Sequence, residues 1–140
     1  MAVEFQISAD HSADVLRELD DKIEAILEAW GVQGVGAVQD IITSESRVDT
    51  GAMRNSISHL VDINDQSVYI GTNIEYAIYH EFGTGIYLEG GGGRQTPWSY
   101  QDAKGNWHRT RGMKPIHMIK NGVSQSVNDF KSIANDILKR

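Results

Sequence analysis

The chain has 140 residues, a formal net charge of −6 and no cysteine. This length corresponds to one domain with a substantial core, and the lack of cysteine excludes disulfides and thiolate metal sites. No apolar run approaches the roughly 20 residues that span a bilayer, and no basic-then-apolar leader opens the chain. We therefore expect one soluble domain over residues 1–140, without a secretion signal. Broad binding to a phosphate backbone is disfavoured because it needs clustered Lys and Arg.

The first segments predict a short strand followed by a long helix. Apolar and polar residues alternate over residues 3–7, which is typical of a half-buried strand. Asp10 or Ser12 is the expected helix cap. Apolar residues then recur at steps of three and four and predict a stripe facing the core: Val15, Leu16, Leu19, Ile23, Ile26, Leu27 and Trp30.

Three glycines, Gly31, Gly34 and Gly36, interrupt this stripe, and each costs about 1 kcal/mol relative to Ala inside a helix. Either the helix breaks here, or the glycines let it pass close to another backbone. Apolar spacing resumes afterwards, so we favour one long or kinked helix over about residues 11–45.

A β-hairpin is predicted next, over residues 56–63 and 67–72. The first run alternates apolar and polar residues, and the second is rich in β-branched and aromatic residues. Asn64, Asp65 and Gln66 between them supply turn chemistry. In front of the hairpin, residues 51–56 can form one helical turn, capped by Asp49 or Thr50 and carrying an Asp49–Arg54 pair.

A short helix is predicted over residues 74–82, because aromatic residues recur there at steps of three and Asn73 can cap it. His80 and Glu81 in this helix are candidates for a metal ligand and a base. Two-histidine zinc sites on helices need the histidines four residues apart, and position 84 is Thr. Adjacent helical residues also point about 100° apart, so we expect neither a metal nor another cofactor at this place.

Residues 83–112 form a long glycine-rich segment, and loops of this length are usually functional or disordered. Within it, two aromatic-rich runs flank Lys104-Gly105-Asn106 and predict a second hairpin, in which Trp98, Tyr100 and Trp107 can pair across the strands. An isolated ribbon is only marginally stable in water. We expect it to be mobile in the free protein or ordered by a neighbouring subunit.

Basic residues gather in and after this segment, whereas acidic residues dominate the first helix. The basic set is Arg94, Lys104, His108, Arg109, Arg111, Lys114, His117 and Lys120. Such a charge dipole suits head-to-tail contact between copies, as in a ring. Solvated loop charges explain it equally well, and a nucleic-acid patch with stacking aromatics is a third interpretation.

A last helix closes the chain, because apolar residues follow helical spacing on one face: Ile119, Val123, Val127, Phe130, Ile133, Ala134, Ile137 and Leu138. Strands clustered between helices indicate the α+β class. We predict an antiparallel sheet packed on one face by the long N-terminal helix and the C-terminal helix, with an extended Gly/Trp-rich hairpin arm over residues 85–112.

An ordered series of short motifs resembles the gene-product-ten-like family of tailed bacteriophages, small proteins of the head–tail junction or tail terminus. The residues that carry the resemblance, and that it implies are structural, are Asp49, Thr50, Gly51, Arg54, Asn55, Gly71, Thr72, Asn73, Tyr76, Ala77, Glu81, Phe82, Gly83 and Thr84. Relatives often have proline where this chain has Arg47. The resemblance also implies a long helix directly before Asp49.

The resemblance implies assembly rather than catalysis. Copies would form a ring that docks on connector or adaptor proteins and on tail-tube or tail-terminator proteins, in the neck or tail end of the virion and in the host cytoplasm during assembly. Genome DNA would pass through the lumen without sequence-specific contact, and no membrane is involved. The expected interface lies in the arm, where the aromatics have too little local core to bury: Trp98, Tyr100, Trp107, Arg109 and Arg111.

Two other functions compete with assembly. A nucleic-acid-binding module would use Arg94, Arg109 and Arg111 and bind in a salt-dependent way. A small hydrolase would use His80 and Glu81, or the region from His108 to His117, and would lose activity on single substitutions there.

Overall fold

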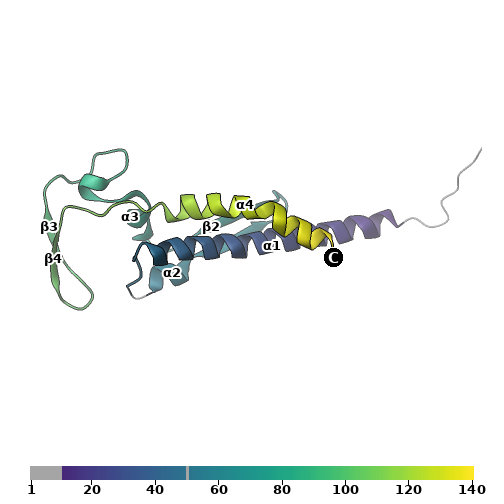
Figure 1. Ribbon diagram of the computed structural model, residues 1–140, viewed down its shortest axis with the longest axis horizontal. Coiled ribbons are helices and arrows are strands. Elements are labelled where there is room, and N and C mark those ends of the chain that lie inside the picture. The colour runs from purple at the N-terminus through teal and green to yellow at the C-terminus, as the bar shows by residue number, and fades with distance from the viewer. Residues whose placement is uncertain (1–10, 50) are drawn as a thin grey trace, which may run out of the picture.

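The computed structural model describes residues 11–49 and 51–140. Figure 1 shows the helices and strands along an elongated molecule. In chain order they are α1 (Ser12–Ser44), α2 (Ala52–Ser56), β1 (Ser58–Asp62), β2 (Ser67–Gly71), α3 (Ala77–Phe82), the 3-10 helix η1 (Gly85–Tyr87), β3 (Trp98–Gln101), β4 (Trp107–Thr110) and α4 (Met118–Leu138). The predicted α+β class is confirmed. The strand predicted over residues 3–7 lies outside the described residues.

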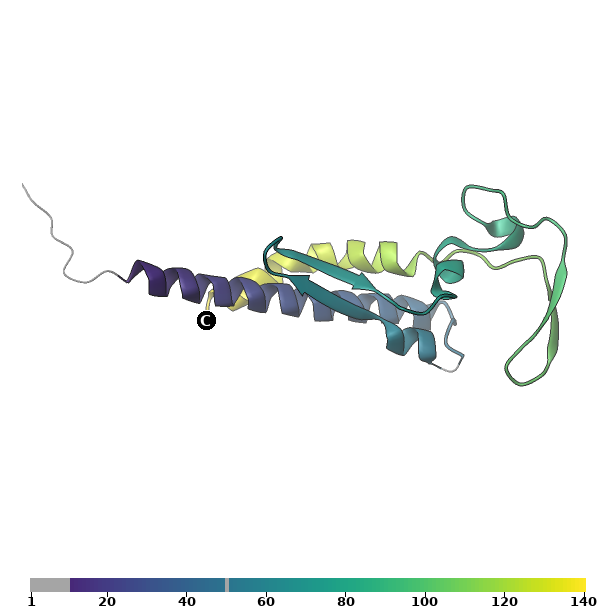
Figure 2. The same ribbon diagram turned by 180° about the vertical axis from the view of Figure 1, so that it is seen from behind.

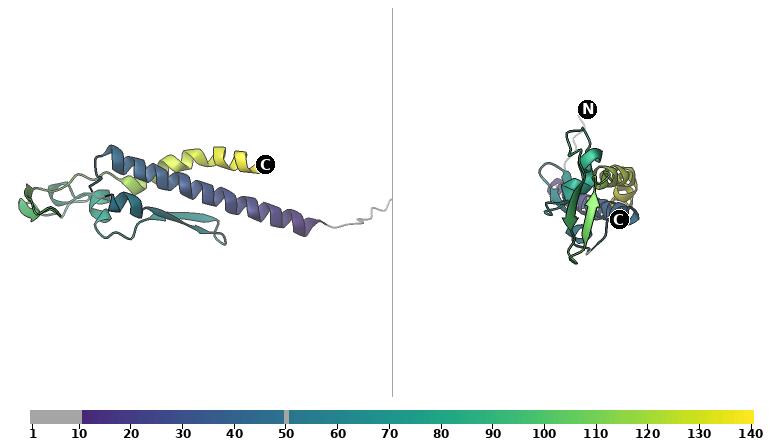
Figure 3. Two further views of the ribbon diagram at one scale, coloured as in Figure 1. Left: turned by 90° about the horizontal axis from the view of Figure 1, so that it is seen from below. Right: turned by 90° about the vertical axis from the view of Figure 1, so that its left-hand side faces the viewer.

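Helix α1 is the central element of the body. Helix α4 runs antiparallel along one side of it, and the β1–β2 hairpin lies along another (Figures 2 and 3). The two hairpins are separate two-stranded antiparallel sheets. None of the described helices combines the length and hydropathy that a membrane span requires.

Gly31 and Gly34 of α1 allow close packing, and the helix continues unbroken through them and Gly36. A Cβ atom at Gly31 would overlap the ring of His59 on β1, and one at Gly34 would overlap the side chain of Ile70 on β2. On α4, a Cβ atom at Gly122 would overlap Val38 of α1. The β1–β2 hairpin and α4 therefore approach α1 at positions without side chains.

The buried core lies toward the C-terminal end of α1, where α2, α3 and the start of α4 converge. Its members are Val38, Ile42, Met53, Ile57, Ala77, Ile116 and Met118. Further along, the indole Nε1 of Trp30 donates to the carbonyl of Ser126 at 2.8 Å, and the Trp30 ring lies 4.7 Å from that of Phe130. These contacts fix α4 along α1.

The expected core stripe of α1 is only partly buried. Ile26 and Leu27 are buried, but Val15, Leu16 and Leu19 are 60%, 61% and 44% exposed. Their exposure has a simple cause, because α4 ends beside Lys22 and no other described element covers the turns before it. The predicted core stripe of α4 is likewise only partly buried. The small residues Gly122 and Ser126 are buried against α1, whereas Val123, Val127, Phe130 and Leu138 are exposed.

Helix starts also differ from the predictions. The N-cap of α1 is His11 rather than Ser12, which is the first helical residue. Helix α3 begins at Ala77 after Tyr76, so Asn73 does not cap it. Short polar residues cap helices only when the backbone positions them at the first turn, and sequence patterns place that turn to within a few residues.

Candidate assembly surface

The root of the arm is closed by backbone contacts between its two ends. The N–H of Thr84 donates to the carbonyl of Met113 at 2.9 Å, and the N–H of Ile86 donates to the carbonyl of Arg111 at 3.1 Å. Gly85 has a φ of 60°, and a Cβ atom there would overlap the Arg111 carbonyl. The Phe-Gly-Thr-Gly motif thus sets the arm in place, since only glycine tolerates both the conformation and the close approach.

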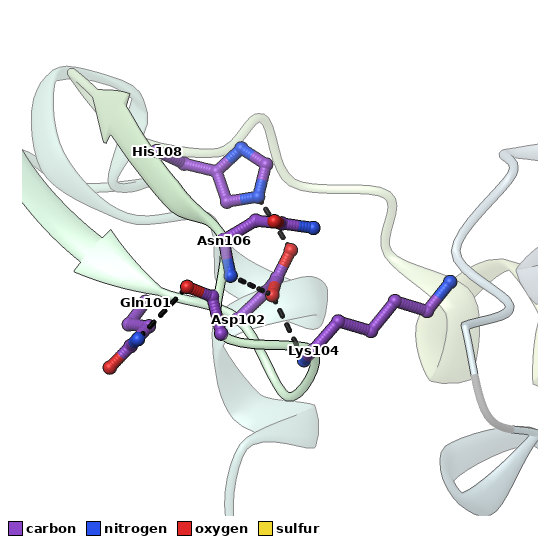
Figure 4. A network of polar contacts seen from close by, with 6 residues as sticks. Gln101, Asp102, Lys104, Asn106 and His108 are labelled. Carbon is purple, nitrogen blue, oxygen red and sulfur yellow. Dashed lines mark hydrogen bonds and ion pairs between the residues drawn. The ribbon is translucent and has the colours of Figure 1, made fainter.

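The tip of the arm is organised around Asp102 (Figure 4). Its carboxylate accepts hydrogen bonds from the backbone N–H groups of Lys104 at 2.9 Å and Asn106 at 2.8 Å. The other oxygen lies 2.7 Å from Nε2 of His108. The hydrogen bond with His108, followed by that from the Asn106 backbone, lowers the pKa of Asp102. The predicted turn at Lys104-Gly105-Asn106 is present, and the carboxylate closes it as an Asx turn does.

The predicted pairing of aromatic side chains across the arm is wrong. The register places Trp98 opposite Thr110, Tyr100 opposite His108 and Trp107 opposite Gln101. Since opposed residues share a face, Trp107 lies on the opposite face from Trp98 and Tyr100. Instead, Tyr100 stacks on His108 at 5.2 Å, and the guanidinium of Arg94 lies 5.5 Å from the Trp98 ring centre.

The arm stands away from the helical body, and β3 and β4 make their extensive contacts with each other (Figures 1 and 2). Trp107 is 70% exposed and Tyr100 is 47% exposed. Arg109 shares the face of Trp107 and is exposed, as is Arg111. The five residues expected at the interface thus all belong to the arm, but they are divided between the two faces of the ribbon and its root at Arg111, and only Trp98 is half-buried.

An apolar patch lies on α3 and η1, next to the root of the arm. We name it the root patch: Ile78, Tyr79, Phe82, Ile86 and Tyr87. Each of these side chains is between 39% and 56% exposed. Two of them, Ile78 and Phe82, also line a shallow hollow formed with Ile74 and Ile119. Exposed apolar patches on a protein surface commonly mark sites of contact with a partner.

Glu81 and His80 have separate structural partners. The carboxylate of Glu81, 8% exposed, accepts hydrogen bonds from the N–H groups of Ile119 at 2.8 Å and Lys120 at 3.1 Å. It therefore caps the first turn of α4, where a negative charge also meets the positive end of the helix dipole. Within residues 11–49 and 51–140, no group of three or more His, Cys, Asp or Glu could hold a metal ion.

His80 packs against Arg47. Its Nδ1 lies 3.1 Å from one guanidinium nitrogen of Arg47, and the other nitrogen donates to the carbonyl of Lys114 at 2.7 Å. Burial first, and then the charge of Arg47, lowers the pKa of His80. Sequence reasoning missed this role of Arg47. Its partners lie 33 and 67 residues away, and no local pattern points to them.

Other motif residues join neighbouring elements. The Nε of Arg54 donates to the hydroxyl of Thr43 at the end of α1. The expected Asp49–Arg54 ion pair is absent among the described residues. The hydroxyl of Thr72 is hydrogen-bonded to the hydroxyl of Ser56 and accepts a hydrogen bond from the N–H of Ile74. The remaining positions cluster nearby: Gly51 is the N-cap of α2, Asn55 lies within α2, Gly71 ends β2, Ala77 is buried, and Gly83 ends α3. Asp49 and Asn73 are exposed, and Thr50 lies outside the described residues.

A family model described as "Bacteriophage HK97-gp10, putative tail-component" matches residues 10–83. The matched range runs from the start of α1 to the end of α3, and it contains the whole motif series except Thr84. The arm and α4 follow it. A search of curated proteins and a search of solved structures give no match.

Proposed function

The chain belongs to the HK97-gp10-like family of bacteriophage tail components, and on this premise we propose that it joins head to tail or completes the tail as an oligomeric ring around the DNA channel. The chain acts as a structural protein of the virion, and its work is assembly. In the ring each copy contacts its neighbour through the arm. The arm and root patch together give the molecule separate surfaces for a second copy and for other phage proteins.

The protruding arm is the observation that carries this proposal. A tryptophan, a tyrosine and two arginines are displayed on a short ribbon whose tip is closed by the Asp102 network. Trp, Tyr and Arg are the residue types that dominate binding energy at protein interfaces. Hydrogen bonds to Asp102 hold the tip of the ribbon, and a segment that is held in its binding conformation loses less conformational entropy on association.

The proposed ring between head and tail implies its partners. Connector or adaptor proteins lie on the head side, and tail-tube or tail-terminator proteins lie on the tail side, with the virion neck or tail end as the location. Genome DNA passes through the lumen without sequence-specific contact. The net charge of −6 suits a lumen along which DNA slides without adhering.

The first experiment is negative-stain microscopy of a phage lysate that lacks this gene. Filled heads lying beside unattached tails are expected. Normally joined particles in that lysate would remove the protein from the neck and the tail end.

A second variant tests the arm itself. Residues 88–110 are replaced by a short glycine linker, which the root permits because Ile86 and Arg111 are already hydrogen-bonded to each other. The variant should fold, as judged by circular dichroism, and should leave heads and tails unjoined. A variant that completes infectious particles would contradict the proposed role of the arm.

Binding of nucleic acid by the arm is the competing function, and Arg94, Arg109 and Arg111 would carry it. Its signature is affinity that falls linearly with salt on a log–log scale. A binding assay with double- and single-stranded DNA at low salt separates the two functions, since assembly alone predicts no such affinity for the free protein.

A further inference from the structure

The first turns of α1 form an extension of the helix that no other part of the described chain covers. Nζ of Lys22 donates to the carbonyl of Arg140, the last residue of the chain, at 3.0 Å. Before that point the helix projects past the end of α4 (Figure 1, purple). We name residues 12–21 the helical extension. Its ten residues are about 15 Å long at 1.5 Å per residue.

The helical extension displays an apolar stripe to solvent. Val15 and Leu16 are 60% and 61% exposed, and Leu19 is 44% exposed. Glu18 and Asp20 lie on either side of this stripe at 100° per residue. A helix that faces only water has no physical reason for such a stripe, so the pattern indicates a partner.

The helical extension and the two turns after it are acidic. Residues 12–28 hold six acidic side chains, against Arg17 and Lys22. Arg17 and Lys22 lie 4.0 Å and 3.8 Å from the carboxylates of Asp14 and Glu18. Asp20, Asp21 and Glu24 form no ion pair with the rest of the described chain. A net negative charge therefore remains beside the apolar stripe.

The arm has the complementary character. Between residues 85 and 120 there are six Lys and Arg residues and two acidic residues, Glu89 and Asp102. Both acidic residues are already engaged, Glu89 with His117 at 3.2 Å and Asp102 with His108. One face of the ribbon then presents Trp107 together with Arg109, and Lys104 is exposed at the tip.

We propose that the Trp107–Arg109 face of the arm binds the acidic helical extension of α1 in a second copy of this chain. Trp107 packs on the stripe of Val15, Leu16 and Leu19, and the cations of the arm lie beside the flanking carboxylates. Apolar and electrostatic complementarity thus coincide on the same two surfaces. The inference rests on the proposed assembly function and names the surface that receives the arm.

The placement of the two surfaces makes the contact intermolecular. The arm and the helical extension lie at opposite ends of the elongated molecule (Figures 1 and 3), so one chain cannot join them. Contact between two different surfaces of identical copies is heterologous. Repetition of such a contact forms a closed ring when the rotation from one copy to the next adds up to a full turn, and a ring in a phage neck needs this geometry.

Charge reversal tests the pairing in particles. Arg109→Glu with Arg111→Glu reverses the arm, and Glu18→Lys with Asp20→Lys reverses the helical extension. Each reversal should lower the number of joined particles at least about tenfold, because like charges then face each other. The chain with all four substitutions should recover to within about threefold of the original, since the attraction is restored with opposite sign.

Crosslinking tests the contact directly, and the chain has no cysteine to interfere. Ser99 lies opposite Arg109 on the binding face, so Val15→Cys with Ser99→Cys places a thiol on each surface without removing Trp107 or Arg109. Oxidised particles should give a ladder of disulfide-linked multimers. The matched control, Asp65→Cys with Ser99→Cys, moves one thiol to the exposed β1–β2 turn and should give none.

The outcomes separate this inference from the proposed function. If reversal of the arm leaves heads and tails unjoined while reversal of the helical extension has no effect, the arm binds another phage protein and the inference fails alone. The inference also fails if the control pair crosslinks as well as the test pair. It fails too if the charge-reversal variants lose joining only in proportion to their loss of salt-dependent DNA binding. Normal joining after deletion of residues 88–110 would overturn both.

Discussion

At the scale of single residues, Glu81 links two parts of the body that are far apart in sequence. It belongs to α3, yet its carboxylate caps α4, 38 and 39 residues further along the chain. Its neighbour His80 faces Arg47 instead. The pair that resembles catalytic machinery in the sequence is thus divided between two structural tasks.

Replacement of Glu81 by Ala should destabilise the protein by about 1–3 kcal/mol, because two partly buried N–H groups of α4 lose their acceptor. Glu81→Gln, which keeps one acceptor oxygen, should cost less. Glu75→Ala, at an exposed position on the same segment, is the control and should have little effect. Urea unfolding followed by circular dichroism measures all three, and equal midpoints for Glu81→Ala and Glu75→Ala would contradict the capping role.

Two glycines of α1 provide a matched pair with opposite expected signs. A Cβ atom at Gly31 overlaps the ring of His59, whereas one at Gly36 meets no atom within 4 Å. Gly31→Ala should therefore destabilise by about 1–3 kcal/mol through overpacking. Gly36→Ala should stabilise by about 0.5–1 kcal/mol because alanine loses less entropy in a helix. Thermal unfolding of the two variants side by side checks this, and a shift of the same sign in both would rule out the packing explanation.

At the scale of elements, the arm is a hairpin whose turn is hydrogen-bonded to one carboxylate, that of Asp102. The pKa of Asp102 is lower in the folded hairpin than in an unfolded chain, where it is about 3.9. A group whose folded pKa is depressed stabilises the fold above its unfolded pKa, and this contribution is lost as pH falls through the folded pKa. The tip should therefore stay closed at neutral pH and open only in acid, below about pH 4.

Amide NMR signals of Lys104 and Asn106 measure this opening, since both N–H groups donate to Asp102. Their chemical shifts should move toward random-coil values in acid, and Asp102→Ala should give such values already at neutral pH. The amides of the β1–β2 hairpin serve as the internal control. Unchanged shifts of Lys104 and Asn106 through the acid range would show that the carboxylate does not hold the turn.

Periodicity in the sequence predicts the elements of this fold but does not show what covers them. The helices over residues 12–44 and 118–138 and both hairpins are at the predicted places. Val15 and Leu19 follow the same spacing as Ile26, yet only Ile26 is buried, because burial depends on where α4 ends. The register of the arm likewise depends on the turn at Asp102, and a shift of register changes which aromatics share a face.

At the scale of the whole molecule, the elongated shape places the core near one end and leaves the helical extension without one. The buried cluster begins at Val38, and Lys22, the residue directly after the extension, donates to the carbonyl of Arg140 just past the end of α4. Stability and assembly should therefore be separable along α1. Truncation is the direct test, since the described turns before Lys22 contain no buried core residue.

A chain that begins at Lys22 should unfold at nearly the same temperature as the full chain, with a change within about 0.5 kcal/mol, as expected for removal of exposed surface. It should nevertheless leave heads and tails unjoined, because the receiving surface for the arm is missing. A chain that begins at His11 is the matched control: it keeps the helical extension, so any defect it shares with the shorter chain arises from residues 1–10. Joining by the chain that begins at Lys22 would mean that the arm needs no helical extension, whereas loss of folding would mean that the turns before Lys22 contribute to the core.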